Sequence, residues 1–128
     1  MKTIGIGVDI VDNKRIKLLI KNQKFMNRIY GKNEILISKK VQNKANYLSK
    51  RFAAKEAFAK ALGTGFRNNL NFKDIEVLND KIGKPYYVVN HKLKNLVRKK
   101  KKVKNFNLFL SISDEKDYSV AFTVIQSK

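Results

Sequence analysis

Residues 3–10, TIGIGVDI, alternate between apolar positions and small or polar ones, and this period of two predicts a β-strand. The branched aliphatic residues share one face of that strand: Ile4, Ile6, Val8 and Ile10. The other face holds two glycines and Asp9, so something bulky could approach the backbone near that carboxylate. Asp9 either ends the strand or has a function. Because Asp is unfavourable inside strands and apolar residues follow it, the pattern favours a function.

Helical patterns follow this strand. Asp12 or Asn13 can cap a helix that runs to about Tyr30, and a shorter helix is predicted over residues 33–40. The polar side of the first helix is mostly basic: Lys14, Arg15, Lys17, Lys21, Lys24 and Arg28. Such a face is ordinarily only solvated. A basic face with apolar residues at its edge also suits an acidic partner helix.

Residues 51–65, RFAAKEAFAKALGTG, predict the latter part of the main helix, with Gly63 at its C-cap. Glu56 and Lys60 are four residues apart and therefore share one stripe. The small alanine side chains let other backbones approach closely, so we expect burial on several sides. Burial of a charge costs free energy, so buried charges are expected to be paired, to bind a metal or to serve a function. The alternative is a solvated helix with an ordinary Glu–Lys pair.

The second half of the chain predicts two hairpins with one helix between them. The predicted strands are residues 74–78 paired with 86–89, and residues 106–113 paired with 118–125. Pro85 starts a strand, where its missing N–H is tolerated. The helix over residues 91–102 ends in KKKK, which is most simply a solvated helix end. The order β-α-α-α-β-β-α-β-β predicts a single α+β domain over residues 1–128.

Composition excludes several classes of protein. A hydrophobic content of 43%, with eight Phe and five Tyr, indicates a globular fold. There is no cysteine and only one histidine, His91, which excludes disulfides, thiolate metal sites and multi-histidine metal sites. No run of about eighteen apolar residues occurs, and the N-terminus leads straight into a strand. We therefore expect neither a membrane span nor a signal peptide, and the cytoplasm as the location.

The charge is strongly positive, with 29 Lys and Arg against 10 Asp and Glu, a net charge of +19. Such a field attracts polyanions: nucleic acid, anionic membrane, a phosphorylated cofactor or an acidic protein. Composition does not choose among them. Most of the excess is lysine and Asn is abundant too, a bias that an AT-rich coding sequence would also produce.

Asp9 and Glu56 are the candidate chemical centre, together with Lys55, Lys60 and the glycine loop after the main helix. Two carboxylates without histidine or cysteine suit a hard cation such as Mg²⁺, which takes one or two carboxylates, several waters and substrate phosphates. The lysines suit the rest of a phosphorylated ligand. The loop also contains Arg67, Asn68 and Asn69, and a glycine loop that leaves a cationic helix suits phosphate.

Two segments carry a family resemblance. The opening GIGVDIVD, followed by Arg15, and the central RFAAKEAFAKALGTG resemble the two signature segments of holo-acyl-carrier-protein synthases, the short class of 4′-phosphopantetheinyl transferases. The resemblance continues through NDKIGKP and LSISDEKDYSVAFTVI, so it covers nearly the whole chain. It implies the 4′-phosphopantetheinyl transferase fold, an antiparallel sheet packed on a long central helix.

The resemblance also implies an activity: transfer of 4′-phosphopantetheine from coenzyme A to a serine of apo-acyl carrier protein, with release of adenosine 3′,5′-bisphosphate, in fatty acid biosynthesis. It implies Mg²⁺ held by Asp9 and Glu56, although the residues do not distinguish Mg²⁺ from Mn²⁺. Lys60 is the expected charge stabiliser, and Glu56 or a metal-positioned water takes the serine proton. A homotrimer with active sites at the subunit interfaces is implied as well.

The resemblance assigns two binding surfaces. The implied coenzyme A site consists of Arg51, Lys55, Gly63, Gly65, Lys84 and Pro85. The implied face for the acidic helix of acyl carrier protein consists of Arg15, Lys21, Lys24 and Arg28. One departure stands out. Where many members have a histidine in the penultimate strand, this chain has Phe109, so no role of that histidine carries over.

Two other functions compete with this one. The charge and the KKKK run would suit a small nucleic-acid-binding domain, whose affinity would fall steeply with salt. The sequence has no RRM-type aromatic signature, zinc finger or helix-turn-helix pattern, and two carboxylates would oppose phosphate binding without a metal, so no specific nucleic acid is expected. The other alternative is a non-catalytic relative that binds coenzyme A or a partner protein.

Overall fold

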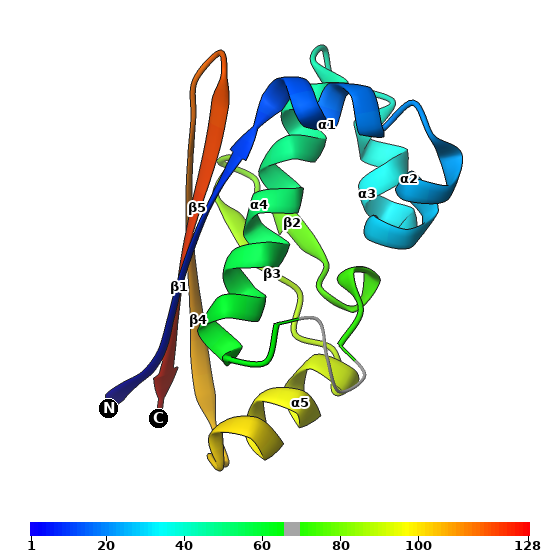
Figure 1. Cartoon of the computed structure of the whole chain (residues 1–128). Helices are drawn as coiled ribbons and strands as arrows, with labels where there is room; N and C mark the ends of the chain where they lie inside the picture. The colour runs from blue at the N-terminus through cyan, green and yellow to red at the C-terminus, as the bar shows by residue number, and fades with distance from the viewer. Residues whose placement is uncertain (66–69) are drawn as a thin grey trace.

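The computed structural model describes residues 1–65 and 70–128. A three-stranded antiparallel sheet, in the order β1-β5-β4, stands on one side of a long helix, α4 (Lys44–Leu62) (Figure 1). Its strands are β1 (Lys2–Asp12), β4 (Phe106–Asp114) and β5 (Tyr118–Ser127). Short helices lie on the other side of α4, and a two-stranded sheet runs behind α4 toward the larger sheet (Figure 1). No helix in the described part of the chain is long and apolar enough to cross a membrane.

The glycines of β1 allow the sheet to approach α4 (Lys44–Leu62) closely. A Cβ atom at Gly5 would overlap the carbonyl oxygen of Ala61, and one at Gly7 would overlap that of Ala57. The bulky object that the sequence predicted over this face of β1 is therefore the central helix itself. Asp9 follows on the same face by alternation, so the same packing brings it to α4.

The central helix is buried on several sides, as predicted. Thirteen of its nineteen residues are buried, and small residues such as Ala53 and Ala54 are completely so. The Asn43 side chain caps its start by accepting a hydrogen bond from the Asn46 N–H, and Gly63 ends it with a left-handed φ of 88°. A mostly solvated helix is thus excluded for this segment.

The first predicted helix is wrong in one respect, because it is divided into α1 (Asn13–Leu19) and α2 (Gln23–Ile29). Between them, the Asn22 side chain accepts hydrogen bonds from the N–H groups of Lys24 and Phe25 and so starts a new helix. Asn readily competes with a helical backbone in this way, which explains the break.

The remaining elements follow the predicted order. They are α3 (Lys32–Ser38), the 3₁₀ turn η1 (Phe72–Asp74), β2 (Val77–Asn79), β3 (Pro85–Tyr87) and α5 (His91–Lys101). β2 and β3 pair with each other, and Pro85 begins its strand as predicted. Apart from the division of the first helix, the α+β order is confirmed.

Candidate active site

Asp9 and Lys60 meet where β1 crosses α4. The Lys60 ammonium Nζ lies 3.0 Å from Asp9 Oδ1 and 3.0 Å from the backbone oxygen of Val8. The Asp9 side chain is 14% exposed, whereas that of Lys60 is 54% exposed. The carboxylate is therefore held in place, while the ammonium can still reach solvent or a ligand.

Glu56 stands one helical turn before Lys60 on α4 and is partly buried. Burial and the nearby charge of Asp9 raise its pKa, while Lys60 and Arg15 act in the opposite direction. The carboxylates of Asp9 and Glu56 are thus close enough to repel each other, although they come from distant parts of the sequence. Their surroundings already include two cations, one from α4 and one from α1.

The donor set matches a hard cation that keeps several waters. Among the described residues no group of three or more His, Cys, Asp and Glu side chains could hold a metal. A pair of carboxylates such as Asp9 and Glu56 is nevertheless what Mg²⁺ takes when waters and substrate phosphates complete its shell. Burial is the main cause of the raised pKa of Glu56 and repulsion by Asp9 is the second; a cation between the carboxylates would relieve that repulsion.

Lys55, predicted to line the coenzyme A site, points instead into the interior and is fully buried. Its ammonium donates to Glu34 Oε1 at 2.7 Å and to the carbonyl oxygens of Phe72 and Ile75. The other oxygen of Glu34 accepts the Val77 N–H at 3.0 Å. All three ammonium hydrogens are used, so this geometry leaves Lys55 no donor for a ligand.

Arg51 is 1% exposed and lies beneath the β2–β3 hairpin, where it donates to Asn79 Oδ1 at 2.6 Å. Its guanidinium carbon is 3.9 Å from the centre of the Tyr47 ring. Burial lowers the pKa of Arg51. Its Nε is the one buried side-chain nitrogen without a hydrogen-bond partner in the described part of the chain. An unsatisfied donor of this kind fits a nearby acceptor supplied by a ligand.

The other predicted coenzyme A residues lie at two turns. Gly63 and Gly65 have positive φ angles and lead away from the end of α4. Lys84 is exposed and precedes Pro85, in a turn where Asp80 Oδ1 accepts the Lys84 N–H at 2.8 Å. The loop residues Arg67, Asn68 and Asn69 lie outside the described residues.

The predicted partner-binding cations are all exposed, but they do not share one helix. Arg15 belongs to α1, Lys21 to the turn after it, and Lys24 and Arg28 to α2. Leu18, which the sequence did not single out, is 67% exposed among them. A strongly exposed leucine within a basic surface is a signal that only the structure provides.

The outer face of the three-stranded sheet, away from α4, is apolar and exposed. Its exposed members are Ile6, Val8 and Ile10 of β1, Phe122 of β5 and Phe109 of β4. Val8 pairs with Phe122 across β1 and β5, and Phe109 pairs with Val124 across β4 and β5. We call these five residues the outer sheet face. A contiguous apolar patch of this kind marks an interaction surface.

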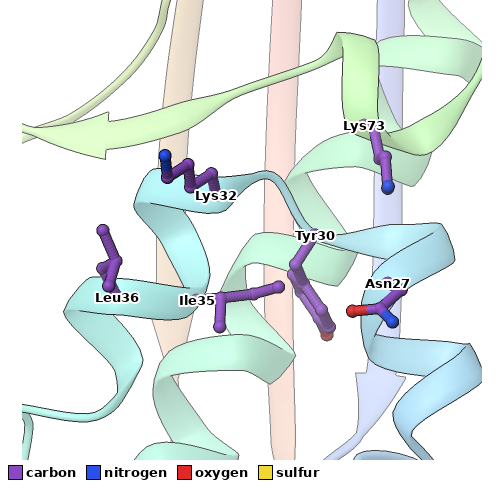
Figure 2. Close-up of a pocket in the computed structure, with 6 residues that line it drawn as sticks. All are labelled: Asn27, Tyr30, Lys32, Ile35, Leu36 and Lys73. Atoms are coloured by element: carbon purple, nitrogen blue, oxygen red, sulfur yellow. The ribbon is translucent and has the colours of Figure 1, made fainter.

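A hollow of about 290 Å³ lies elsewhere, between α2, α3 and η1 (Figure 2). In Figure 2, Ile35 points toward Tyr30, and Lys73 approaches from η1 on the side of Asn27. The lining is completed by Lys32 and Leu36. This hollow shares no lining residue with the predicted site.

A family model described as the 4′-phosphopantetheinyl transferase superfamily matches residues 5–123. The chain belongs to this family. The predicted resemblance to holo-acyl-carrier-protein synthases is confirmed, and with it the prediction of a transferase enzyme and its fold.

Three relatives illustrate the match. The holo-[acyl-carrier-protein] synthase of Pelagibacter ubique (strain HTCC1062) is 60% identical over 128 residues, which is 100% of both chains. The crystal structure of the holo-[acyl-carrier-protein] synthase from Neisseria meningitidis has 41% identity to this chain and a TM-score of 0.87. The match covers 98% of this chain and 99% of the Neisseria meningitidis chain. The structure from Bacillus anthracis, in complex with CoA (3′,5′-ADP), has 35% identity and a TM-score of 0.82 over 100% of both chains.

Proposed function

We propose that this protein transfers the 4′-phosphopantetheine group from coenzyme A to a serine of apo-acyl carrier protein, and so supports fatty acid biosynthesis. The other product would be adenosine 3′,5′-bisphosphate. The observation that carries this proposal is the meeting of Asp9, Glu56 and Lys60 between β1 and α4. The Pelagibacter ubique relative, named for this activity, is similar over its entire length. The cytoplasm stays the predicted location.

Asp9 and Glu56 are the residues that would hold the metal, which we propose is Mg²⁺ or Mn²⁺. When bound, such an ion neutralises pyrophosphate charge and stabilises the charge that develops on the leaving phosphate. The proposal is supported by the two adjacent carboxylates and by the raised pKa of Glu56.

Lys60 and Glu56 would divide the remaining chemistry. The Lys60 ammonium is half-exposed and can donate a hydrogen bond to a phosphate oxygen while staying near Asp9. The Glu56 carboxylate, in the same proposed centre as Lys60, would take the serine proton. A water beside the carboxylates would serve the same purpose.

The coenzyme A phosphates would bind beside the β2–β3 hairpin and the end of α4. Arg51 supplies a buried guanidinium with one free donor, and Lys84 supplies an exposed ammonium next to Pro85. Gly63 and Gly65 would line the approach from α4. Lys55 is left out of this proposed site because its donors are used internally.

The acidic recognition helix of acyl carrier protein would bind the exposed cations of α1, the turn after it and α2: Arg15, Lys21, Lys24 and Arg28. The positive charge of Arg15 reaches Glu56, so this surface borders the proposed chemical centre. The net charge of +19 would steer an acidic partner toward the protein. Leu18 of α1 is strongly exposed and would add an apolar contact to this surface.

We further propose a homotrimer, in which each outer sheet face is covered by another copy. The support is the apolar, exposed character of Ile6, Val8, Ile10, Phe109 and Phe122. Asp9 belongs to β1, the same strand that carries three of these residues, so active sites at the subunit interfaces would follow from such an assembly.

The decisive experiment is mass spectrometry of apo-acyl carrier protein incubated with this protein, coenzyme A and Mg²⁺. We expect the carrier to gain one phosphopantetheine, and EDTA to prevent the gain. Binding of coenzyme A without any transfer would overturn the proposed enzyme in favour of a non-catalytic relative.

A further inference from the structure

Asn13 forms a hydrogen-bond network at the junction of three elements. It is the first residue of α1 and is 9% exposed. Its side-chain Nδ2 donates to the carbonyl oxygens of Glu115 at 3.0 Å and Lys116 at 3.2 Å. Its Oδ1 accepts from Ser49 Oγ at 2.7 Å and Ser119 Oγ at 2.8 Å. The side-chain amide thus uses its full capacity of two donors and two acceptors.

The chemistry of the partners fixes the orientation of this amide. Backbone carbonyls can only accept hydrogen bonds, so Nδ2 must face Glu115 and Lys116, and Oδ1 must face the serines. Ser49 and Ser119 are completely buried, so their hydroxyls cannot donate to solvent in place of Asn13. The Asn13 backbone N–H adds a hydrogen bond to the carbonyl oxygen of Asp117 at 2.8 Å.

Two of the three elements joined by Asn13 carry proposed site residues: α4 holds Glu56, and α1 holds Arg15 of the partner surface. Ser49 lies on α4 seven residues before Glu56, which is two turns along the same face of the helix. Arg15 follows Asn13 by two residues on α1, and its charge reaches Glu56. The third element is the β4–β5 turn, which Asn46 of α4 also holds through Asp114 Oδ2 at 2.9 Å.

We propose that Asn13 is a positioning residue for the transfer reaction. It fixes the start of α1, and with it Arg15, relative to Glu56 on α4, and thereby sets how acyl carrier protein docks at the site. This inference rests on the proposed function. An apolar side chain could fill the same volume, but only a fully satisfied polar network fixes one orientation of three elements at once.

Two substitutions test the network by steady-state kinetics with each substrate varied separately. Asn13→Asp keeps the size and both acceptors but loses the two donors toward the β4–β5 turn. Ser119→Ala removes one donor to Oδ1 and is milder. We expect the KM for acyl carrier protein to rise, on the order of tenfold for Asn13→Asp and less for Ser119→Ala, because a displaced contact weakens productive docking. The KM for coenzyme A should stay unchanged.

The matched control is Tyr87→Phe, which also removes a buried hydroxyl that bridges α4 and β5. That hydroxyl lies 2.6 Å from the carbonyl oxygen of Ala54 and 2.6 Å from Thr123 Oγ. We expect this variant to lose stability without a change in the KM for the carrier. If Asn13→Asp does not fold, the Ser49→Ala/Ser119→Ala double variant serves in its place.

A double-mutant cycle with Arg15→Ala separates positioning from stability alone. If Asn13 acts through Arg15, the effect of Asn13→Asp on the KM for the carrier should shrink by several-fold in the Arg15→Ala background. Full additivity, or an unchanged KM in every network variant, would overturn the positioning role. A wild-type protein that transfers nothing would instead overturn the proposed function, so the two failures are distinguishable.

Discussion

Lys60 and Asp9 are 51 residues apart in the sequence, yet the ammonium of one lies 3.0 Å from a carboxylate oxygen of the other. This pair joins the central helix to the first strand at the point where Glu56 is also within electrostatic reach. Because Lys60 is half-exposed, the pair can open toward a ligand without unfolding either element.

Removal of either carboxylate should abolish transfer without loss of the fold. Asp9→Ala and Glu56→Ala each remove one of two groups that would hold the metal, so we expect activity to fall by roughly a thousandfold or more. Product formation followed by mass spectrometry and the circular dichroism spectrum test this together. Asp74→Asn, which alters a carboxylate paired with Lys92 on another part of the molecule, should keep full activity. Full activity in Asp9→Ala or Glu56→Ala would refute the assignment.

Glu56 should destabilise the metal-free protein at neutral pH. Its pKa is raised in the folded state, so the folded protein holds the proton more tightly than the unfolded chain does. Stability from this group is therefore present at low pH and is lost as pH rises through the folded-state pKa. In EDTA at pH 7, Glu56→Gln should raise Tm by about 1–3 °C, a small value because Glu56 is only partly buried.

The same variant gives an internal control. The difference in Tm between Glu56→Gln and wild type should shrink as pH falls below the ordinary pKa of 4.5. Addition of Mg²⁺ should stabilise the wild type more than Glu56→Gln, since the variant lacks one carboxylate. A wild type that is more stable than the variant at pH 7 in EDTA would contradict the prediction.

Loss of Lys55 should act on stability and not on coenzyme A affinity. Lys55→Met leaves the carboxylate of Glu34 buried without its cation, which costs about 3–5 kcal/mol. Urea unfolding measures this change. The double variant Lys55→Met/Glu34→Gln should recover part of the stability, because no unpaired charge is left. A stable Lys55→Met protein with a raised KM for coenzyme A would show that Lys55 contacts the ligand after all.

Charge reversal on the proposed partner surface should weaken carrier binding. Lys24→Glu should raise the KM for acyl carrier protein by on the order of tenfold at low salt and by less at high salt, where surface charges are screened. Lys99→Glu on α5 changes net charge equally and is the control for general steering. A shift in the KM for coenzyme A, or an equal effect of both variants, would contradict the assigned surface.

The outer sheet face offers a test of assembly. Val8 is 53% exposed and pairs with Phe122, so Val8→Glu places a charge in the middle of the apolar patch. We expect this variant to be a monomer by light scattering, and activity to fall if the sites are interfacial. Ile82→Glu in the β2–β3 turn, where Ile82 is 90% exposed, should leave the oligomer unchanged. A monomeric wild type would refute the trimer.

Local patterns were enough to predict the order of the strands, the central helix and its C-terminal end, because alternation, alanine content and Gly63 each act within a few residues. The predicted strand over residues 74–78 is shorter than expected, since β2 covers only Val77–Asn79 and Phe72–Asp74 form a 3₁₀ turn. The glycines at positions 5 and 7 indicated that something bulky could approach the backbone near Asp9, and the structure shows that it is α4. The break at Asn22 was not predicted. It is caused by the Asn22 side chain, which accepts hydrogen bonds from the N–H groups of Lys24 and Phe25, while the apolar pattern of the helix continues across it.

The surroundings and hydrogen-bond partners of the Lys55 and Asn13 side chains could not be predicted in the same way. Lys55 and Glu56 are adjacent in a charged segment, yet the helix points one into the interior and the other toward Asp9. The acceptors of Lys55 are Glu34, 21 residues earlier, and the carbonyl oxygens of Phe72 and Ile75, 17 and 20 residues later. The partners of Asn13 include Ser119, 106 residues away, so no local pattern could reveal them.

The pairing of β1 with β5 has a consequence for how the protein forms. In the described sheet β1 has β5 as its only neighbour, with Lys2 opposite Ser127 and Asp9 opposite Ala121. Contacts between such distant segments close large loops and therefore form slowly. During synthesis, α1 to α4 leave the ribosome long before β5. The strand that carries Asp9 can therefore pair in the sheet only after the last part of the chain has been synthesised.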